Sequence, residues 1–275
     1  MTPSSSHLLV FTSSLSLRIY EVPDLSLGSA KLVQPIRIIP RSHDAPIHVC
    51  KADPTSTYVA SGSADGVVKV WNILRGYVTH VFKGHGGVVS ALAFDYPQDT
   101  TSLSHESVMR LITASVDTRI RIFNLNGGGS TSSGGGRPEA LLEGHVSVPR
   151  GLDVSFDGRW LVSGGRDSVV LIWDLFPSMQ PSKKANGKTS LKRIPILVRT
   201  IPVLERVEAV GILSPGENLA GDLAKSEDLR FFTGGEKGIV KIWDGSNGKV
   251  LFKLGTEQTA TSNDHQEQRQ IVDVL

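Results

Sequence analysis

Serine, histidine and aspartate recur in this chain at spacings that could bring their side chains together. His145, Ser163 and Asp167 form one such set, and an equally spaced set begins at His43. A serine activated by histidine, with a carboxylate orienting the ring, is the arrangement of acyl-transfer enzymes. Nucleophilic hydrolysis is therefore the first chemistry to test against the rest of the sequence.

The repetition itself argues against catalysis. No nucleophile elbow or oxyanion loop accompanies these serines, and each set is followed by an aromatic residue. We therefore interpret the sets as buried hydrogen-bond networks, in which the carboxylate accepts at a turn and orients the imidazole. The expected network residues are His43, Ser61, Asp65 and Trp71, then His85, Thr113, Asp117 and Phe123, then His145, Ser163, Asp167 and Trp173, and finally Thr233 and Trp243.

The first and third networks are complete in sequence, whereas the other two are not. Phe123 has no indole N–H, and the fourth set has Lys237 at the aspartate position and no histidine. Buried hydrogen bonds to charged groups contribute on the order of 1.5–3 kcal/mol each. The fourth unit should consequently be the least stable.

Short strands and tight turns must position these side chains. Residues 61–71, 113–123, 163–173 and 233–243 each read as a strand, a tight turn and an alternating apolar strand, which predicts antiparallel hairpins. Segments 42–49, 84–91 and 144–151 precede three of the hairpins, and two of them carry Gly-His. Four strands per unit, running from Gly-His to Trp, resemble WD40 propeller blades.

This resemblance implies an all-β fold, a WD40 β-propeller of about four and a half four-stranded blades. Segment 7–20 matches the second half of a blade, with Tyr20 at the aromatic position. WD40 rings most often close at seven blades, so we expect an open arc with unpaired backbone edges. A fragment, a truncated gene product and completion by another polypeptide all remain open. The expected units are 7–26 (half blade), 31–77, 78–125, 138–176 and 194–246 (blades), 249–254 (outer strand of the next blade) and 255–275 (tail), all in one propeller domain.

Bulk properties exclude several other classes. The chain has 275 residues, a net charge of +2 and one cysteine, Cys50, so it is no polycation and cannot form an intrachain disulfide. We expect no secretory signal, membrane segment, metal, cofactor or small-molecule substrate, because the corresponding motifs are missing. His105 and His265 lie in polar segments and are interpreted as solvated.

Insertions interrupt the units at 97–109, 126–138, 177–193 and 214–228, and strand alternation puts all four on one face of the disc. The insertion 177–193 is basic, so it is either a solvated loop or a contact to RNA phosphates, an acidic partner or an import receptor. Its basic residues are Lys183, Lys184, Lys188, Lys192 and Arg193. On the opposite face, Arg150, Arg166 and Glu236 are candidate partner contacts.

Four segments carry a more specific resemblance: 53–73, 76–94, 143–175 and 200–213, the last containing VEAVGIL. They are similar to the transducin beta-like WD40 subunits of the small-subunit processome, which associate with U3 snoRNA. The resemblance implies a non-enzymatic nucleolar scaffold among other WD40 propeller proteins, with U3 snoRNA and pre-rRNA as direct or indirect partners, supporting early processing to 18S rRNA. Family members carry two tandem propellers and a helical C-terminal region, and this chain resembles part of the first propeller.

Two other functions are known for propellers of this kind. Substrate receptors of cullin-type ubiquitin ligases carry arginine three residues after the blade-ending aromatic, where this chain has Leu74, Asn126, Phe176 and Ser246. A propeller hydrolase would need a convergent acid–base pair, which the sequence does not indicate. A scaffold in ribosome biogenesis is the leading expectation, and a ubiquitin-ligase adaptor or other interaction propeller is the alternative.

Overall fold

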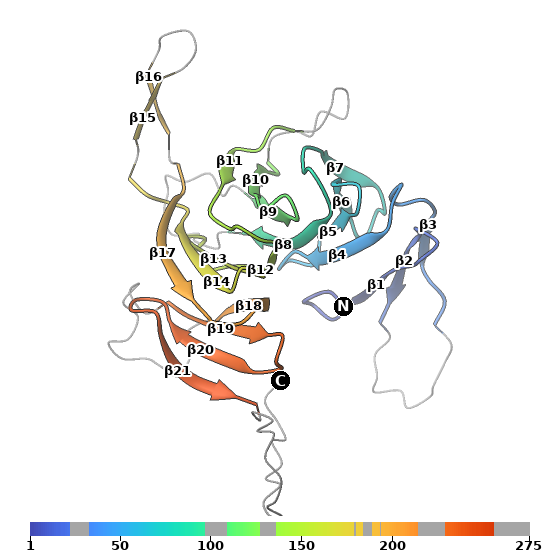
Figure 1. Cartoon of the computed structure of the whole chain (residues 1–275). Coiled ribbons are helices and arrows are strands. Elements are labelled where there is room, and N and C mark those ends of the chain that lie inside the picture. Colours follow the sequence, from blue (N-terminus) through green and yellow to red (C-terminus); the bar gives the residue numbers. More distant parts are fainter. Residues whose placement is uncertain are drawn as a thin grey trace, which may run out of the picture.

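The chain folds into short antiparallel β-sheets arranged as an arc (Figure 1). The computed structural model describes residues 1–22, 33–96, 109–126, 136–178, 180–183, 189–192, 194–213 and 229–255. Within these ranges it has 21 strands and no helix, and four of its sheets have four strands each, so the expected all-β fold of four-stranded blades is confirmed. No helix in the described ranges could cross a membrane.

Each sheet is a meander in which successive strands pair in order. The first sheet has three strands: β1 (His7–Phe11), β2 (Leu17–Glu21) and β3 (Arg37–Ile39). The second has β4 (Ile47–Ala52), β5 (Tyr58–Ser63), β6 (Val68–Asn72) and β7 (Val78–Phe82). The third has β8 (Val89–Asp95), β9 (Arg110–Ser115), β10 (Ile120–Asn124) and β11 (Ala140–Leu142). The fourth has β12 (Pro149–Val154), β13 (Trp160–Gly165), β14 (Val169–Asp174) and β17 (Ile196–Pro202). The fifth has β18 (Val207–Leu213), β19 (Arg230–Gly235), β20 (Val240–Asp244) and β21 (Lys249–Leu254).

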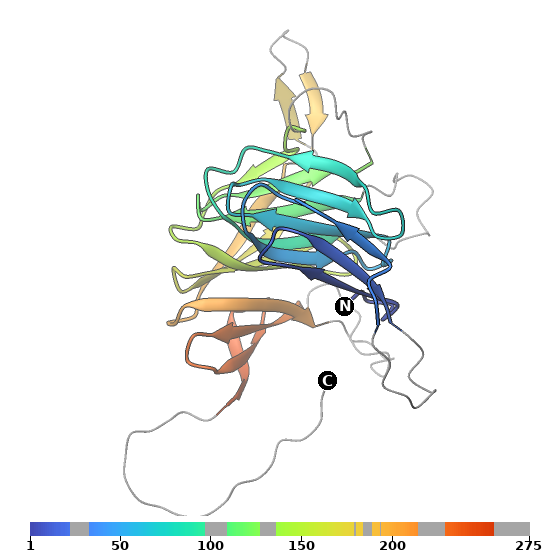
Figure 2. The same cartoon turned by 90° about the vertical axis from the view of Figure 1, so that its right-hand side faces the viewer.

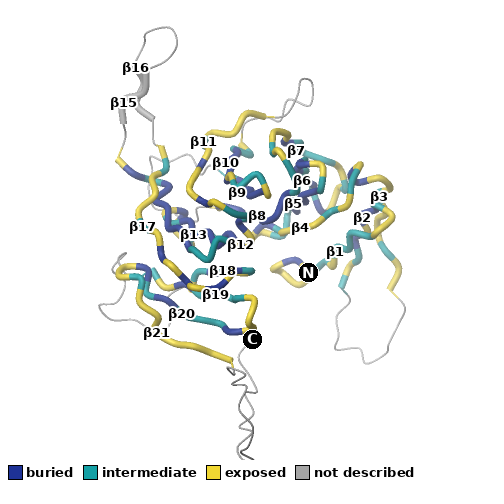
Figure 3. Tube along the Cα trace, viewed as in Figure 1, coloured by how far each residue is buried: buried dark blue, intermediate teal, exposed yellow. Residues whose placement is uncertain are grey.

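We call the four complete sheets blades 1 to 4, beginning with β4–β7. Strands β4, β8, β12 and β18 lie innermost and pack against one another, and β7, β11, β17 and β21 form the rim (Figures 1 and 2). Apolar side chains pack between adjacent sheets. The dark-blue parts of the tube in Figure 3 mark the buried residues along the strands. The first sheet joins this core through Leu17 and Ile19, which pack on Trp71.

The sheets do not coincide with the units expected from the sequence. Each predicted unit began with an outer strand, but that strand pairs with the preceding hairpin: β7 pairs with β6, and β17 with β14. Likewise, β21 pairs with β20 and completes blade 4, although 249–254 was expected to belong to a next blade. The repeat in sequence and the blade in space are offset by one strand. The leading half blade is also larger than expected, because β3 adds to it.

The described part of the chain does not close into a ring, and blade 4 has one uncovered face. Its Leu254 is opposite Val240 and is 49% exposed. The corresponding residues of the other blades, Phe82, Leu142 and Ile201, are at most 5% exposed because the next sheet covers them.

One feature extends beyond the blades. Strands β15 (Gln180–Lys183) and β16 (Thr189–Lys192) pair as a hairpin between β14 and β17, and this hairpin stands away from the rim (Figure 1). It lies within the basic insertion, whose basic side chains are outside the described residues. Most of the other three insertions, His105, His265 and residues 256–275 are outside them as well.

Candidate partner-binding surfaces

Blade 3 contains a complete buried network. Nδ1 of His145 lies 2.9 Å from Oδ2 of Asp167, and its Nε2 lies 2.9 Å from Oγ of Ser163. The indole N–H of Trp173 donates to the same serine oxygen at 3.1 Å. Because an ionised carboxylate only accepts, Nδ1 carries the proton and the serine hydroxyl donates to Nε2. Burial lowers the pKa of His145, against the opposing charge of Asp167.

Blade 2 reverses that pattern. Nη1 of Arg121 lies 2.5 Å from Nδ1 of His85 and donates at 2.8 Å to Oδ2 of Asp117, which is 3.6 Å from the imidazole. A guanidinium can only donate, so Nδ1 is the acceptor and Nε2–H donates to Thr113, at 2.7 Å. Burial and then the charge of Arg121 lower the pKa of His85 to about 4.

The full set expected in blade 1 does not form. Nε2 of His43 lies 2.7 Å from Oγ of Ser61, which also accepts from Trp71 at 2.9 Å. Asp65, however, is exposed, and its carboxylate accepts from the backbone N–H of Val67 within the turn. Nδ1 of His43 has no hydrogen-bond partner in the described part of the chain. Burial, followed by the charge of Lys69, lowers the pKa of His43 to about 4.

Blade 4, which lacks the histidine as expected, has an ion pair in its place. Glu205 precedes Thr233 by the same interval as His85 precedes Thr113, and it is 6% exposed. Its Oε1 lies 2.6 Å from Nζ of Lys241. Lys237, at the sequence position of the aspartate, is exposed and takes no part. Sequence reasoning missed Glu205 because Leu-Glu stands in place of Gly-His.

These networks are sealed from solvent. Ser61 and Ser163 are both 0% exposed, and each hydroxyl already bonds histidine and tryptophan. A substrate carbonyl could not reach either oxygen without opening the blade. No three histidine, cysteine or acidic side chains of the described ranges are placed to hold a metal.

Polar side chains instead gather at one end of the central axis, and all of them except the buried Ser90 are at least partly exposed. Each innermost strand has a register shift after its first residue, which leaves one residue unpaired: His48, Ser90, Arg150 and Glu208. Such bulges redirect a side chain out of the regular alternation. The repeat of this irregularity places a different polar group from each blade at the axis.

Two of the expected partner-contact residues meet there. Nε of Arg150 and Nε of Arg166 donate to opposite oxygens of Glu208, at 2.9 and 2.8 Å. Burial alone would raise the pKa of Glu208, but these hydrogen bonds and charges lower it. The two guanidinium groups share one carboxylate, so the trio keeps one net positive charge. Their side chains are 39% and 46% exposed. We call Arg150, Arg166 and Glu208 the axial charge cluster.

The third expected contact, Glu236, does not belong to this cluster. It forms another ion pair, in which its Oε2 lies 3.6 Å from Nη1 of Arg206. Lys184, Lys188 and Arg193 of the basic insertion lie outside the described residues, and only the backbone of Lys183 and Lys192 is described. Their expected role in binding stays a prediction.

Comparison with known proteins identifies the repeats. The WD domain, G-beta repeat family matches residues 34–72, 76–124 and 136–174. The chain is 35% identical over 210 residues to transducin beta-like protein 3 of Homo sapiens and 34% identical to that of Rattus norvegicus. It is 27% identical over 257 residues, or 91% of its length, to U3 small nucleolar RNA-associated protein 13 of Saccharomyces cerevisiae. The chain spans 22% of the length of the mammalian proteins and 26% of the yeast protein.

Proposed function

The chain is a WD40-repeat protein, and from that premise we propose that it is a non-catalytic scaffold in a nucleolar complex for ribosome small-subunit biogenesis. In this proposal it holds other WD40 propeller proteins in place near U3 snoRNA and pre-rRNA, and so supports early processing toward 18S rRNA. The observation that carries it is the similarity to the yeast U3-associated protein over 91% of the chain.

The side-chain chemistry supports a scaffold. The only Ser-His-Asp set that assembles among the described residues is buried and already satisfied, so it supports the blade. The axial charge cluster, by contrast, is accessible and carries a net positive charge. A partner that brings a carboxylate or phosphate to this end of the axis would neutralise the net positive charge of the cluster.

The proposal is tested by tagging the chain, locating it and measuring U3 snoRNA in the purified complex. We expect nucleolar staining and U3 recovery that falls when Arg150 and Arg166 are both changed to glutamate. Arg75→Glu combined with Lys253→Glu, an equal charge change at two other exposed positions, is the matched control and should leave recovery unchanged. A cytosolic protein that co-purifies with a cullin and without U3 would overturn the proposal.

A further inference from the structure

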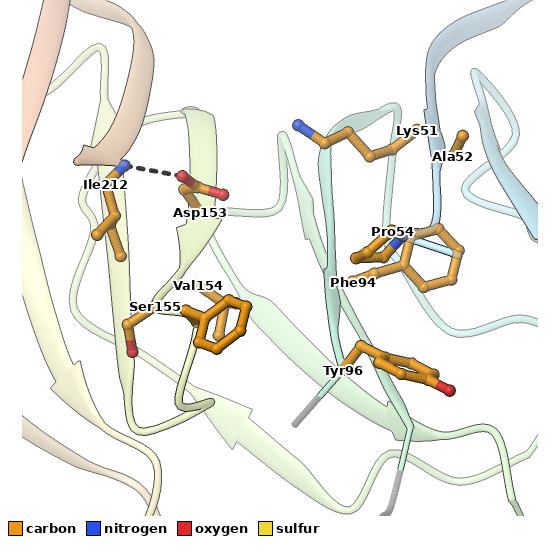
Figure 4. A pocket seen from close by; sticks show the side chains of 10 residues that line it. Lys51, Ala52, Pro54, Phe94, Tyr96, Asp153, Val154, Ser155 and Ile212 are labelled. Atoms are coloured by element: carbon orange, nitrogen blue, oxygen red, sulfur yellow. Dashed lines mark hydrogen bonds between the residues drawn. The ribbon is translucent and has the colours of Figure 1, made fainter. Parts of the chain in front are cut away.

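A pocket of about 240 Å³ lies at the other end of the axis, where the innermost strands finish. All four blades contribute to its wall, and Figure 4 shows two sides facing each other. Asp153 and Ile212 lie on one side, and Lys51, Phe94 and Tyr96 on the other. The axial charge cluster is at the opposite end of these strands, so the pocket is a separate site.

The wall of the pocket is mixed, slightly more polar than apolar, and it includes accessible aromatic rings. Phe156 is 65% exposed and Tyr96 is 38% exposed, while Phe94 is 9% exposed and belongs to the core. Exposed aromatic side chains at the edge of a concave site are typical anchor points for protein partners. Small-molecule and cofactor sites are usually about 300–1,000 Å³. This smaller pocket therefore has the size for a single side chain, and its aromatic rings offer that side chain apolar contacts.

The charges around the pocket favour a peptide over a nucleic acid. Lys51 is exposed and has no ion pair in the described part of the chain. Oδ2 of Asp153 accepts from the backbone N–H of Ile212 at 2.7 Å, which fixes the carboxylate and leaves Oδ1 to accept another hydrogen bond. One lysine and one aspartate give no net positive charge, whereas RNA-binding surfaces are basic.

We propose that this pocket binds an extended acidic–apolar segment of a partner protein. The apolar side chain of the segment enters between Phe156, Tyr96 and Phe94. A neighbouring carboxylate pairs with Lys51, and a backbone N–H of the segment donates to Asp153. The inference deepens the scaffold function and rests on it, because it names the chemistry of one partner contact.

The test measures fluorescence anisotropy of labelled peptides with the full chain. The probes are fluorescein-labelled Gly-Glu-Leu-Gly-Gly, the same peptide with lysine for glutamate, and the same peptide with glycine for leucine. We expect the Glu-Leu peptide to bind about two- to fivefold tighter than the Lys-Leu peptide, as for an exposed ion pair. Lys51→Glu should reverse that preference, and Phe156→Ala should abolish the advantage of leucine over glycine.

Lys253→Glu is the matched control, since Lys253 is an exposed lysine on the rim strand β21. It should leave the peptide preference unchanged. The proposal fails if Lys51→Glu does not reverse the preference, or if labelled oligouridylate binds the pocket and displaces the peptide. If no peptide binds but U3 snoRNA still co-purifies with the chain, the pocket proposal alone is lost and the scaffold function stands.

Discussion

Arg121 donates a hydrogen bond to Nδ1 of His85, and so takes the place beside the ring that Asp167 has beside His145. A donor in one blade and an acceptor in the other require opposite imidazole tautomers, Nε2–H in His85 and Nδ1–H in His145. Two blades with the same sequence signature therefore use opposite hydrogen-bond directions.

Arg121→Leu is expected to switch the tautomer of His85. Leu171 stands at this position in blade 3, so the substitution suits the blade. Without the guanidinium, the carboxylate of Asp117 can accept from Nδ1–H, and the pKa of His85 should rise from about 4, since Arg121 contributes to lowering it. NMR of the imidazole nitrogens measures both. An unchanged His85 spectrum would contradict the assignment, and His145 provides the internal reference.

Ser163→Ala should destabilise the fold, because Ser163 belongs to a structural hydrogen-bond network and not to a catalytic site. The indole N–H of Trp173 and the ring of His145 would lose their shared partner, and unsatisfied buried polar groups cost about 1–3 kcal/mol. Urea denaturation should show this loss in the free energy of unfolding. Ser13→Ala, at an exposed serine, is the control and should change it by less than about 0.5 kcal/mol. A Ser163→Ala protein as stable as the parent would refute the network's structural role.

Stability should fall as the pH is lowered from about 6.5 to 4. The folded-state pKa values of His43 and His85 are about 4, against 6.5 in the unfolded chain, so the unfolded state binds more protons in this window. Each histidine changes the unfolding free energy by at most about 1.4 kcal/mol per pH unit. Urea midpoints at pH 7 and 5 measure the slope, which His43→Gln should reduce.

The titration of Asp95 changes the pH dependence of stability in the opposite direction. Burial raises the pKa of its carboxyl to about 6, against the effect of Arg110, so the folded state holds a proton that the unfolded state releases between about pH 3.8 and 6. Asp95→Asn should therefore steepen the loss of stability on acidification. A shallower slope in this variant would mean that another group dominates the window.

Gly66→Ala should destabilise blade 1 far more than Gly238→Ala destabilises blade 4. Both glycines have positive φ, 77° and 76°, in equivalent turns, so both changes introduce backbone strain of about 1 kcal/mol. A Cβ at Gly66 would also lie 2.6 Å from the carbonyl oxygen of His85, whereas one at Gly238 meets nothing within 4 Å. Thermal denaturation of the two variants compares them, and equal losses would rule out the inter-blade contact.

The hairpins, their turns and the all-β fold could be predicted because alternation and turn residues are local signals. The polar core was harder to predict. Lys69, Arg121 and Lys241 alternate with apolar residues as solvent-facing side chains do, yet each lies opposite a buried hydroxyl and bonds within the blade. Glu205 was missed because a carboxylate paired with a strand lysine occupies the position that an imidazole has in the other blades, so neither the residue type nor its partner matches the repeat. Bulges such as the one at Arg150 leave no trace in hydropathy.

The uncovered face of blade 4 has a consequence for how the arc opens. Within the described ranges, blades 1 to 3 are each held between two neighbouring sheets, but the sheet around Phe232 and Leu254 is held from one side only. In a row of units coupled to their neighbours, fluctuations begin where a unit lacks one neighbour. Amide hydrogens of β19 and β20 should thus exchange with solvent before those of β9 and β13. Unfolding should begin at blade 4 and proceed from there toward the inner blades.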